Sequence, residues 1–180
     1  MKRLQIILVA IAIIVFAGVA ISASYTDYRK VYDEYYKRPL TEIHKEAKDL
    51  QFDDPEKALM LYSMVINSYA KGLSEEEKRA CASAYNNSGY LYFFLYSDYP
   101  TAYGYFLKAL EINTEMSNED PLVASSAHLN IGNIFINHSV KDRALKHYYQ
   151  SAKIAKNADL YKNAQTAVFN YLTSSMQDTY

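Results

Sequence analysis

Histidine and cysteine are the side chains in this sequence that could carry acid–base, nucleophilic or metal chemistry. The four histidines are His44, His128, His138 and His147. None stands three or four residues from another, which is the spacing that puts two metal ligands on one helix face. The one cysteine, Cys81, can form neither an intramolecular disulfide nor a cysteine-rich metal site. We therefore expect no metal and no cofactor.

Sequence motifs for phosphate binding and hydrolysis are missing as well. The sequence has no glycine-rich phosphate loop, no Gly-x-Ser-x-Gly elbow and no His-Glu-x-x-His pair. The acidic run Glu75-Glu76-Glu77 stands where acids complement a helix N-terminus, so we interpret it as structural. Catalysis would need Tyr90 or His138 to be assisted by groups that no sequence motif reveals. The sequence predicts a protein that is not an enzyme.

The composition favours long helices and argues against a nucleic-acid partner. Half of the 180 residues are hydrophobic, which is enough for a core, and only five are glycine and four proline. The net charge is −1 and no block of lysine and arginine occurs, so we expect no nucleic acid to bind. Nineteen tyrosines suit packing between helices with the hydroxyl at the rim, although a tyrosine-lined ligand groove is the alternative.

The N-terminal segment has the pattern of a targeting sequence. Lys2 and Arg3 precede an unbroken apolar run from Ile6 to Ile21, and small residues follow it. This pattern is typical of a secretory signal peptide, which we place at residues 1–24. The uncharged stretch 4–26 is also long enough to cross a bilayer as a retained anchor. Both interpretations predict a membrane-associated or exported protein on the periplasmic or extracytoplasmic side. Arg29, Lys30, Lys37 and Arg38 follow the apolar run and outnumber Lys2 and Arg3, so the inverted topology, with the domain facing the cytosol, stays open.

Capping residues indicate where the helices begin. Asp54-Pro55 and Asp120-Pro121 each read as an N-cap followed by a first-position proline, and Ser74 with Glu77 forms a capping box. Between these signals apolar residues recur at steps of three and four, and no segment has the alternation of a strand. Short loops make consecutive helices antiparallel neighbours. The predicted helices lie near residues 26–37, 40–50, 55–70, 75–96, 100–117, 121–137, 140–156 and 160–176.

A pattern of small and aromatic residues recurs every 40–44 positions. The segment from Ala84 to Gly89 matches that from Ala127 to Gly132, and Ala167 to Asn170 repeats its start. The second helix of each unit has its own pattern. It carries an alanine, then an aromatic residue four positions later, then a small or aliphatic residue three positions after that. These sets are Ala58, Tyr62 and Val65; Ala102, Phe106 and Ala109; and Ala144, Tyr148 and Ser151. We expect the small residues to let two helix backbones approach closely while the aromatic rings fill the space beside them.

This pattern resembles the tetratricopeptide repeat family over residues 40–176. Tyr85, Gly89 and Tyr92 fill the family's first-helix positions, and the Ala102 set fills those of the second helix. The resemblance implies an all-α fold, a right-handed superhelical array of antiparallel helix hairpins (an α-solenoid), after the N-terminal apolar helix. The chain departs from the family in its spacing, which is usually about 34 residues, in lacking the proline between repeats, and in having Glu46 where the first unit should have glycine.

The predicted domain organisation has three parts. Residues 1–24 are the signal or anchor, residues 25–39 a tyrosine-rich linker or helix, and residues 40–180 a domain of about three and a half repeats. The repeat units are 40–72, 75–117, 121–157 and 160–180. The last unit lacks a second helix, so either it caps the array, or it is a contact surface, or the sequence is a fragment of a longer protein.

The resemblance places the ligand groove on the first helices of the units. The groove candidates it gives are Asn86, Asn87, Tyr90, Phe94, Asn130, Asn133, Asn137 and Asn170. An asparagine amide both donates and accepts, so it can hold a peptide backbone; alternatively, these asparagines bond between neighbouring repeats. The family's clamp for a terminal carboxylate needs basic residues on these helices. We do not expect it, because the corresponding positions are Ser83, Asn86, Ser126 and Leu129.

Two hypotheses for function follow. The first is a non-catalytic scaffold that binds a protein or peptide segment, resembling the extracytoplasmic sensor region of bacterial membrane-anchored repeat proteins, with the membrane contacted through residues 4–26 if they are not cleaved. It would then be part of a longer signalling or transcriptional regulator. The second is a structural subunit of an envelope complex that forms homo-oligomers through its terminal helices.

Overall fold

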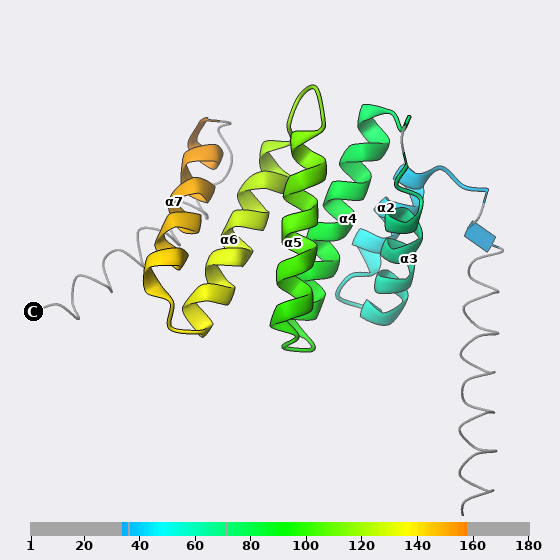
Figure 1. The fold of residues 1–180 in the computed structure, drawn as a ribbon. Helices are drawn as coiled ribbons and strands as arrows, with labels where there is room; N and C mark the ends of the chain where they lie inside the picture. The colour runs from blue at the N-terminus through cyan, green and yellow to red at the C-terminus, as the bar shows by residue number, and fades with distance from the viewer. Residues whose placement is uncertain (1–33, 36, 71, 158–180) are drawn as a thin grey trace, which may run out of the picture. The chain divides into compact units, whose positions relative to one another are not determined.

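The computed structural model describes residues 34–35, 37–70 and 72–157, and this part of the chain is helical without a β-strand. Contacts divide the chain into two units, Met1–Arg38 and Pro39–Tyr180. The second unit carries six described helices (Figure 1). They are α2 (Leu40–Leu50), α3 (Pro55–Asn67), α4 (Glu75–Phe94), α5 (Tyr99–Thr114), α6 (Pro121–Asn137) and α7 (Lys141–Asn157). The all-α class is confirmed for these residues.

The six central helices lie where the sequence predicts them, within three residues at each end. The helix expected at 160–176 and the apolar segment 4–26 lie outside the described residues, as does nearly all of the helix expected at 26–37. Within the part that is described, none of the helices is both long enough and apolar enough to span a membrane.

Side-chain caps set the helix starts. The Asp54 carboxylate accepts a hydrogen bond from the Lys57 backbone N–H at 3.0 Å, which satisfies one of the free donors at the start of α3. The predicted capping box of α4 forms, because Ser74 and Glu77 each accept from the other's backbone N–H. Ser139 and Asp142 have the residue spacing of a capping box, with aspartate in place of glutamate, but Ser139 is not the N-cap of α7. Ser139 has a φ of 60°, outside the extended conformation of an N-cap residue, and α7 begins at Lys141.

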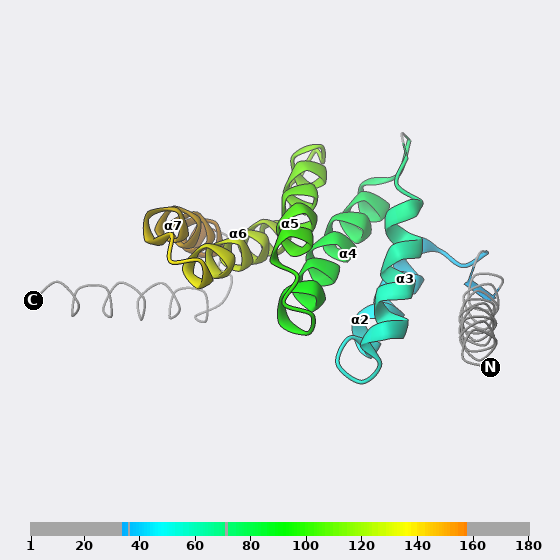
Figure 2. The same cartoon turned by 60° about the horizontal axis from the view of Figure 1, so that its bottom comes forward.

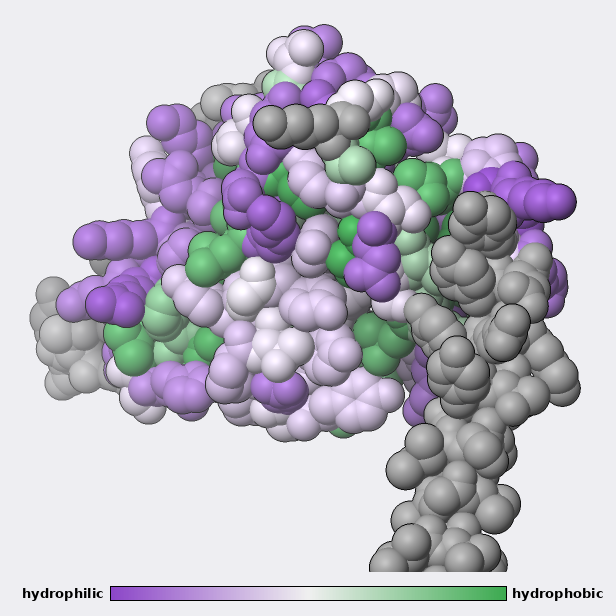
Figure 3. All heavy atoms as spheres, turned by 45° about the vertical axis from the view of Figure 1, so that its right-hand side comes forward, coloured by the Kyte–Doolittle hydropathy of each residue, from purple (hydrophilic) through white to green (hydrophobic). Residues whose placement is uncertain are grey.

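The helices pair as successive hairpins, α2–α3, α4–α5 and α6–α7, which lie side by side in Figures 1 and 2. Each helix packs on the next along the chain, and α4 also packs on both α2 and α6. The first helices of the three hairpins therefore share one row. On the face drawn in Figure 3, exposed hydrophobic side chains form separate patches among hydrophilic ones.

Glycines at the helix crossings set the distance within two hairpins. A Cβ on Gly89 would lie 2.8 Å from the Phe106 ring and 3.2 Å from the carbonyl oxygen of Ala102. A Cβ on Gly132 would lie 2.5 Å from the Tyr148 ring. The distances to the two rings are shorter than contacts between carbon atoms allow. The Phe106 ring of α5 therefore lies directly on the backbone of Gly89 in α4, and the Tyr148 ring of α7 lies directly on that of Gly132 in α6. This is the close approach expected from the repeat.

The first hairpin has no glycine at the corresponding position, and a neighbouring small residue of α2 is buried. Glu46, which stands at the glycine position of the sequence alignment, is only partly buried and forms an ion pair with Lys57 at 3.6 Å. The adjacent Ala47 is fully buried instead. The small residue that packs in α2 is thus one position further along than the alignment indicates.

The crossing predicts opposite effects for two glycine-to-alanine changes. Gly89→Ala should lower the free energy of unfolding by about 1–2 kcal/mol, since overpacking against Phe106 outweighs the gain in helix propensity. Gly104→Ala should raise it by about 0.5–1 kcal/mol, because Gly104 lies in α5 with nothing within 4 Å of an added Cβ. Thermal unfolding followed by circular dichroism measures both changes. Equal shifts for the two variants would contradict the proposed crossing.

Candidate functional site

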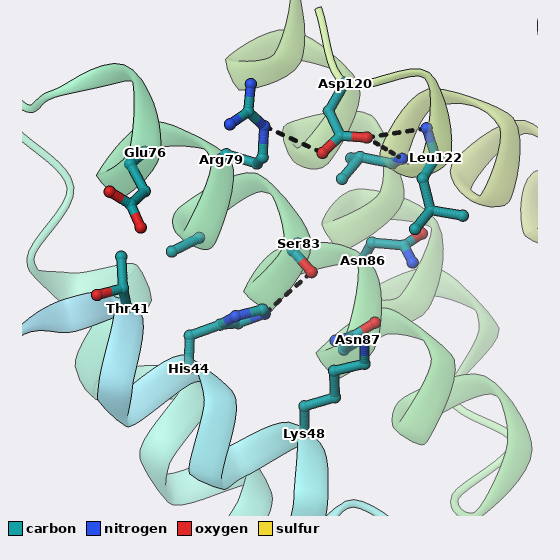
Figure 4. Close-up of a pocket in the computed structure, with 12 residues that line it drawn as sticks. Thr41, His44, Lys48, Glu76, Arg79, Ser83, Asn86, Asn87, Asp120 and Leu122 are labelled. Carbon is teal, nitrogen blue, oxygen red and sulfur yellow. Dashed lines mark hydrogen bonds and ion pairs between the residues drawn. The ribbon is translucent and has the colours of Figure 1, made fainter. Parts of the chain in front are cut away.

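The row of first helices holds a cavity of about 440 Å³, which we call the polar cavity. Its walls come from α2, α4 and the start of α6 (Figure 4). The lining residues are Thr41, His44, Lys48, Glu76, Arg79, Ala80, Ser83, Asn86, Asn87, Asp120, Leu122 and Val123. Two of the predicted groove residues, Asn86 and Asn87, are among them. On α4 the lining residues recur at steps of three and four, so they occupy one face of the helix.

Two side-chain pairs connect the walls of the polar cavity. Arg79 Nε lies 3.1 Å from Asp120 Oδ2, which joins α4 to the N-cap of α6. His44 Nε2 and Ser83 Oγ share a hydrogen bond of 2.9 Å, which joins α2 to α4. The sequence search did not single out Arg79, Asp120 or His44 for this site, because each bond joins different hairpins.

The His44–Ser83 pair has the separation of a base and a nucleophile, but its electrostatics argue against that role. Burial, and then the positive charge of Lys48, lower the pKa of His44 to about 4. An imidazole with so low a pKa is a weak base at neutral pH. Within the described helices no carboxylate bonds to the other ring nitrogen to raise its basicity. The pair therefore serves as a neutral hydrogen bond between helices.

Asn86 is the unusual side chain of the cavity. It is only 8% exposed, and its Oδ1 has no hydrogen-bond partner among the described residues. A buried acceptor without a donor costs roughly 1–3 kcal/mol. The exposed side chains of Lys48 and Glu76 also line the cavity, and neither forms an ion pair in the part of the chain described. The residues that line the cavity thus include a buried acceptor without a donor in the described chain, and one charge of each sign outside any ion pair there.

Asn87 and Asn133 are engaged with tyrosines. Asn87 Nδ2 donates to Tyr62 Oη at 3.1 Å, and that hydroxyl donates to Gln51 at 3.0 Å. This bond connects α4 to the preceding hairpin, as the alternative interpretation of the repeated asparagines expects. Asn133 Oδ1 accepts from Tyr148 Oη at 2.8 Å, within the α6–α7 hairpin.

The remaining asparagine candidates are not gathered in the cavity. Asn130 occupies the repeat position of Asn87 and is buried, but the residue that corresponds to Tyr62 is Phe106, which has no hydroxyl to accept its amide hydrogen. Asn137 is exposed at the last position of α6. Asn170 lies outside the described residues.

The two aromatic candidates lie near the end of α4, outside the polar cavity. The Tyr90 and Phe94 rings stack with their centroids 5.8 Å apart, and the Phe52 ring meets Tyr90 edge-on at 6.3 Å. Phe52 and Phe94 are 73% and 65% exposed. Phe52, in the loop before α3, escaped the sequence reasoning because it belongs to no repeat position.

Two histidines meet across the last described hairpin. His128 Nδ1 and His147 Nδ1 lie 3.0 Å apart, so one ring donates and the other accepts. Burial, and then the charge of His147, lower the pKa of His128 to about 4; burial lowers the pKa of His147 as well.

No group of three metal-ligating side chains occurs in the described residues. Cys81 is buried, which raises its pKa to about 11 and leaves it a poor nucleophile.

Comparison of the chain with protein-family models, with curated proteins and with solved structures finds no match. What the structure itself shows for the described residues is a series of consecutive helix hairpins with a polar cavity on the row of first helices.

The histidine pair predicts a stability that falls with acid. The unfolded chain takes up protons near the ordinary histidine pKa of 6.5, whereas folded His128 takes one up only near pH 4. Between these values the unfolded state binds more protons, so the free energy of unfolding decreases as the pH falls. Chemical denaturation from pH 8 to pH 4 measures this slope. His128→Gln with His147→Gln should make it shallower, and an unchanged slope would show that the pair contributes nothing.

Proposed function

We propose that this chain is a non-catalytic scaffold of tetratricopeptide type that binds an extended segment of a protein or peptide in the polar cavity. The observation that carries the proposal is the buried Asn86 Oδ1, which lacks a donor among the described residues. A protein gains no stability from leaving such an acceptor empty. A ligand that supplies an N–H group gives the acceptor its partner.

An extended peptide fits this requirement better than a compact ligand. It presents backbone N–H groups at regular intervals, and one of them can donate to Asn86. Lys48 and Glu76 can then each contact a side chain or terminus of opposite charge. The ion pair Arg79–Asp120 and the bond His44–Ser83 hold the walls in place before the ligand arrives, which lowers the entropic cost of binding.

The arrangement of the hairpins supports the array that the repeat resemblance implies. The small and aromatic residues of the repeat meet at Gly89–Phe106 and Gly132–Tyr148, and α4 contacts both α2 and α6. We propose that the hairpins continue as a right-handed superhelical stack. We further propose that residues 4–26 direct the domain to the membrane or across it, as the sensor region of a longer regulator.

Assembly of an envelope complex is the second candidate. Exposed aromatic and aliphatic side chains at the ends of the hairpins favour it: Phe52, Phe94, Leu95 and Tyr96 are each more than two-fifths exposed. Such groups often mark a protein interface. Light scattering of the full-length chain in nanodiscs distinguishes the assembly subunit from the peptide-binding scaffold. Phe94→Ser should dissociate an oligomer if assembly is the function. It should leave the measured mass unchanged if the chain is a monomeric scaffold.

Replacing Asn86 should separate stability from binding. Asn86→Leu removes the unpaired acceptor at nearly constant volume, so we expect the free energy of unfolding to rise by about 1–3 kcal/mol. The same change should abolish capture of partner proteins when the full-length chain in nanodiscs is used as bait and the bound proteins are identified by mass spectrometry. A gain in stability together with a loss of partners is the expected signature.

Asn87→Leu is the matched control. It breaks the bond to Tyr62 and leaves that buried hydroxyl without its donor, so the free energy of unfolding should fall by about 1 kcal/mol or more. An Asn86→Leu chain that is less stable than the wild type, or that captures the same proteins, would refute the proposed role of Asn86.

A further inference from the structure

A second cavity, of about 330 Å³, lies between the start of α5, the end of α6 and the start of α7, and we call it the apolar cavity. It shares no lining residue with the polar cavity. Tyr103 and Phe135 form its walls with their rings in edge-to-face contact, 5.8 Å between centroids. Val140 also lines it and is 39% exposed, so we call its side of the cavity the mouth.

The turn between α6 and α7 builds this mouth. Ser139 adopts the left-handed conformation, with φ 60°, and its backbone N–H bonds to the Ile136 carbonyl at 2.9 Å. The next N–H, that of Val140, bonds to the Phe135 carbonyl at 2.9 Å. These two bonds fix the chain reversal, so the cavity is bounded by backbone that is held in place and not by a loose loop.

The charges of the apolar cavity are of one sign. The Arg143 guanidinium lies over the Phe135 ring, 5.6 Å from its centroid, and forms no ion pair among the described residues. His138 lies edge-on to Tyr99 at 5.1 Å and contacts the Ile134 carbonyl through Nδ1 at 2.8 Å. None of the described residues that line the cavity is an aspartate or a glutamate. The apolar cavity thus has a cation in its lining and, among these residues, no acid to neutralise it.

We propose that the apolar cavity binds a partner peptide through one large apolar side chain that has an acidic residue next to it. The apolar side chain would displace water from Tyr103, Phe135 and Val140, a burial that contributes roughly 25 cal/mol per Å². The neighbouring carboxylate would pair with Arg143, whose planar guanidinium can bind both carboxylate oxygens. A basic segment would leave Arg143 without a counter-charge. A purely polar segment would leave the rings of Tyr103 and Phe135 in contact with water.

The test is selection of peptides from a random library on the full-length chain in nanodiscs, with parallel selections on three variants. We expect the wild-type chain to enrich peptides in which a leucine, isoleucine or phenylalanine adjoins an aspartate or glutamate. Arg143→Glu should lower the affinity of these peptides at least about tenfold, the equivalent of about 1.4 kcal/mol. It should also switch the enriched neighbour from acidic to basic.

Two further variants keep the test decisive. Lys153→Glu makes the same change of charge at another exposed position of α7 and should leave both affinity and selected sequences unchanged. Val140→Trp fills the mouth from an exposed position and should remove the enrichment without unfolding the chain. Peptides enriched without an acidic neighbour, or peptides that bind Arg143→Glu and Lys153→Glu equally well, would overturn the proposal. Enrichment that survives Val140→Trp would also overturn it. So would selected peptides that bind empty nanodiscs as well as they bind the wild-type chain.

Discussion

The contact between a glycine backbone and an aromatic ring is the constraint on which the rest of this structure depends. At Gly89–Phe106 and at Gly132–Tyr148 the ring occupies the volume that a Cβ would need. The two helices of a hairpin can therefore lie closer than ordinary side chains allow. That closeness buries Ala102, Ala109 and Ala144 completely. It also fixes the rotation of α4 and α6, and hence which of their residues face α2 and the polar cavity.

Tyrosine explains why neighbouring asparagines have different roles. A phenylalanine fills the crossing in α5, but tyrosines occupy the corresponding positions in α3 and α7, and both of these tyrosines are buried. Asn87 and Asn133 supply the hydrogen bonds that these hydroxyls need. Asn86 has no such neighbour, and its oxygen stays without a protein donor among the described residues. Packing therefore accounts for Asn87 and Asn133, and the proposed ligand accounts for Asn86.

Local signals in the sequence predicted the helices well and the cavities poorly. Caps such as Ser74–Glu77 act within four residues, so α4 begins where the sequence indicates. Asn86 and Asn87 differ by about 100° around the helix, and only the neighbouring hairpin decides which one meets a tyrosine. The His128–His147 contact was missed for a similar reason, since its partners are 19 residues apart on facing helices. Segments 4–26 and 160–176 remain predictions.

Helix α6 connects the two proposed binding sites. Val123, near its start, lines the polar cavity, and Phe135, near its end, lines the apolar cavity. Twelve residues at 1.5 Å each separate these two positions by about 18 Å along the helix. At 100° per residue the same two positions also face directions about 120° apart around α6, so a segment lying along one face of the helix does not reach both. The apolar cavity is further lined by residues of α5 and α7, none of which lines the polar cavity. Each proposed peptide contact can therefore be tested without the other.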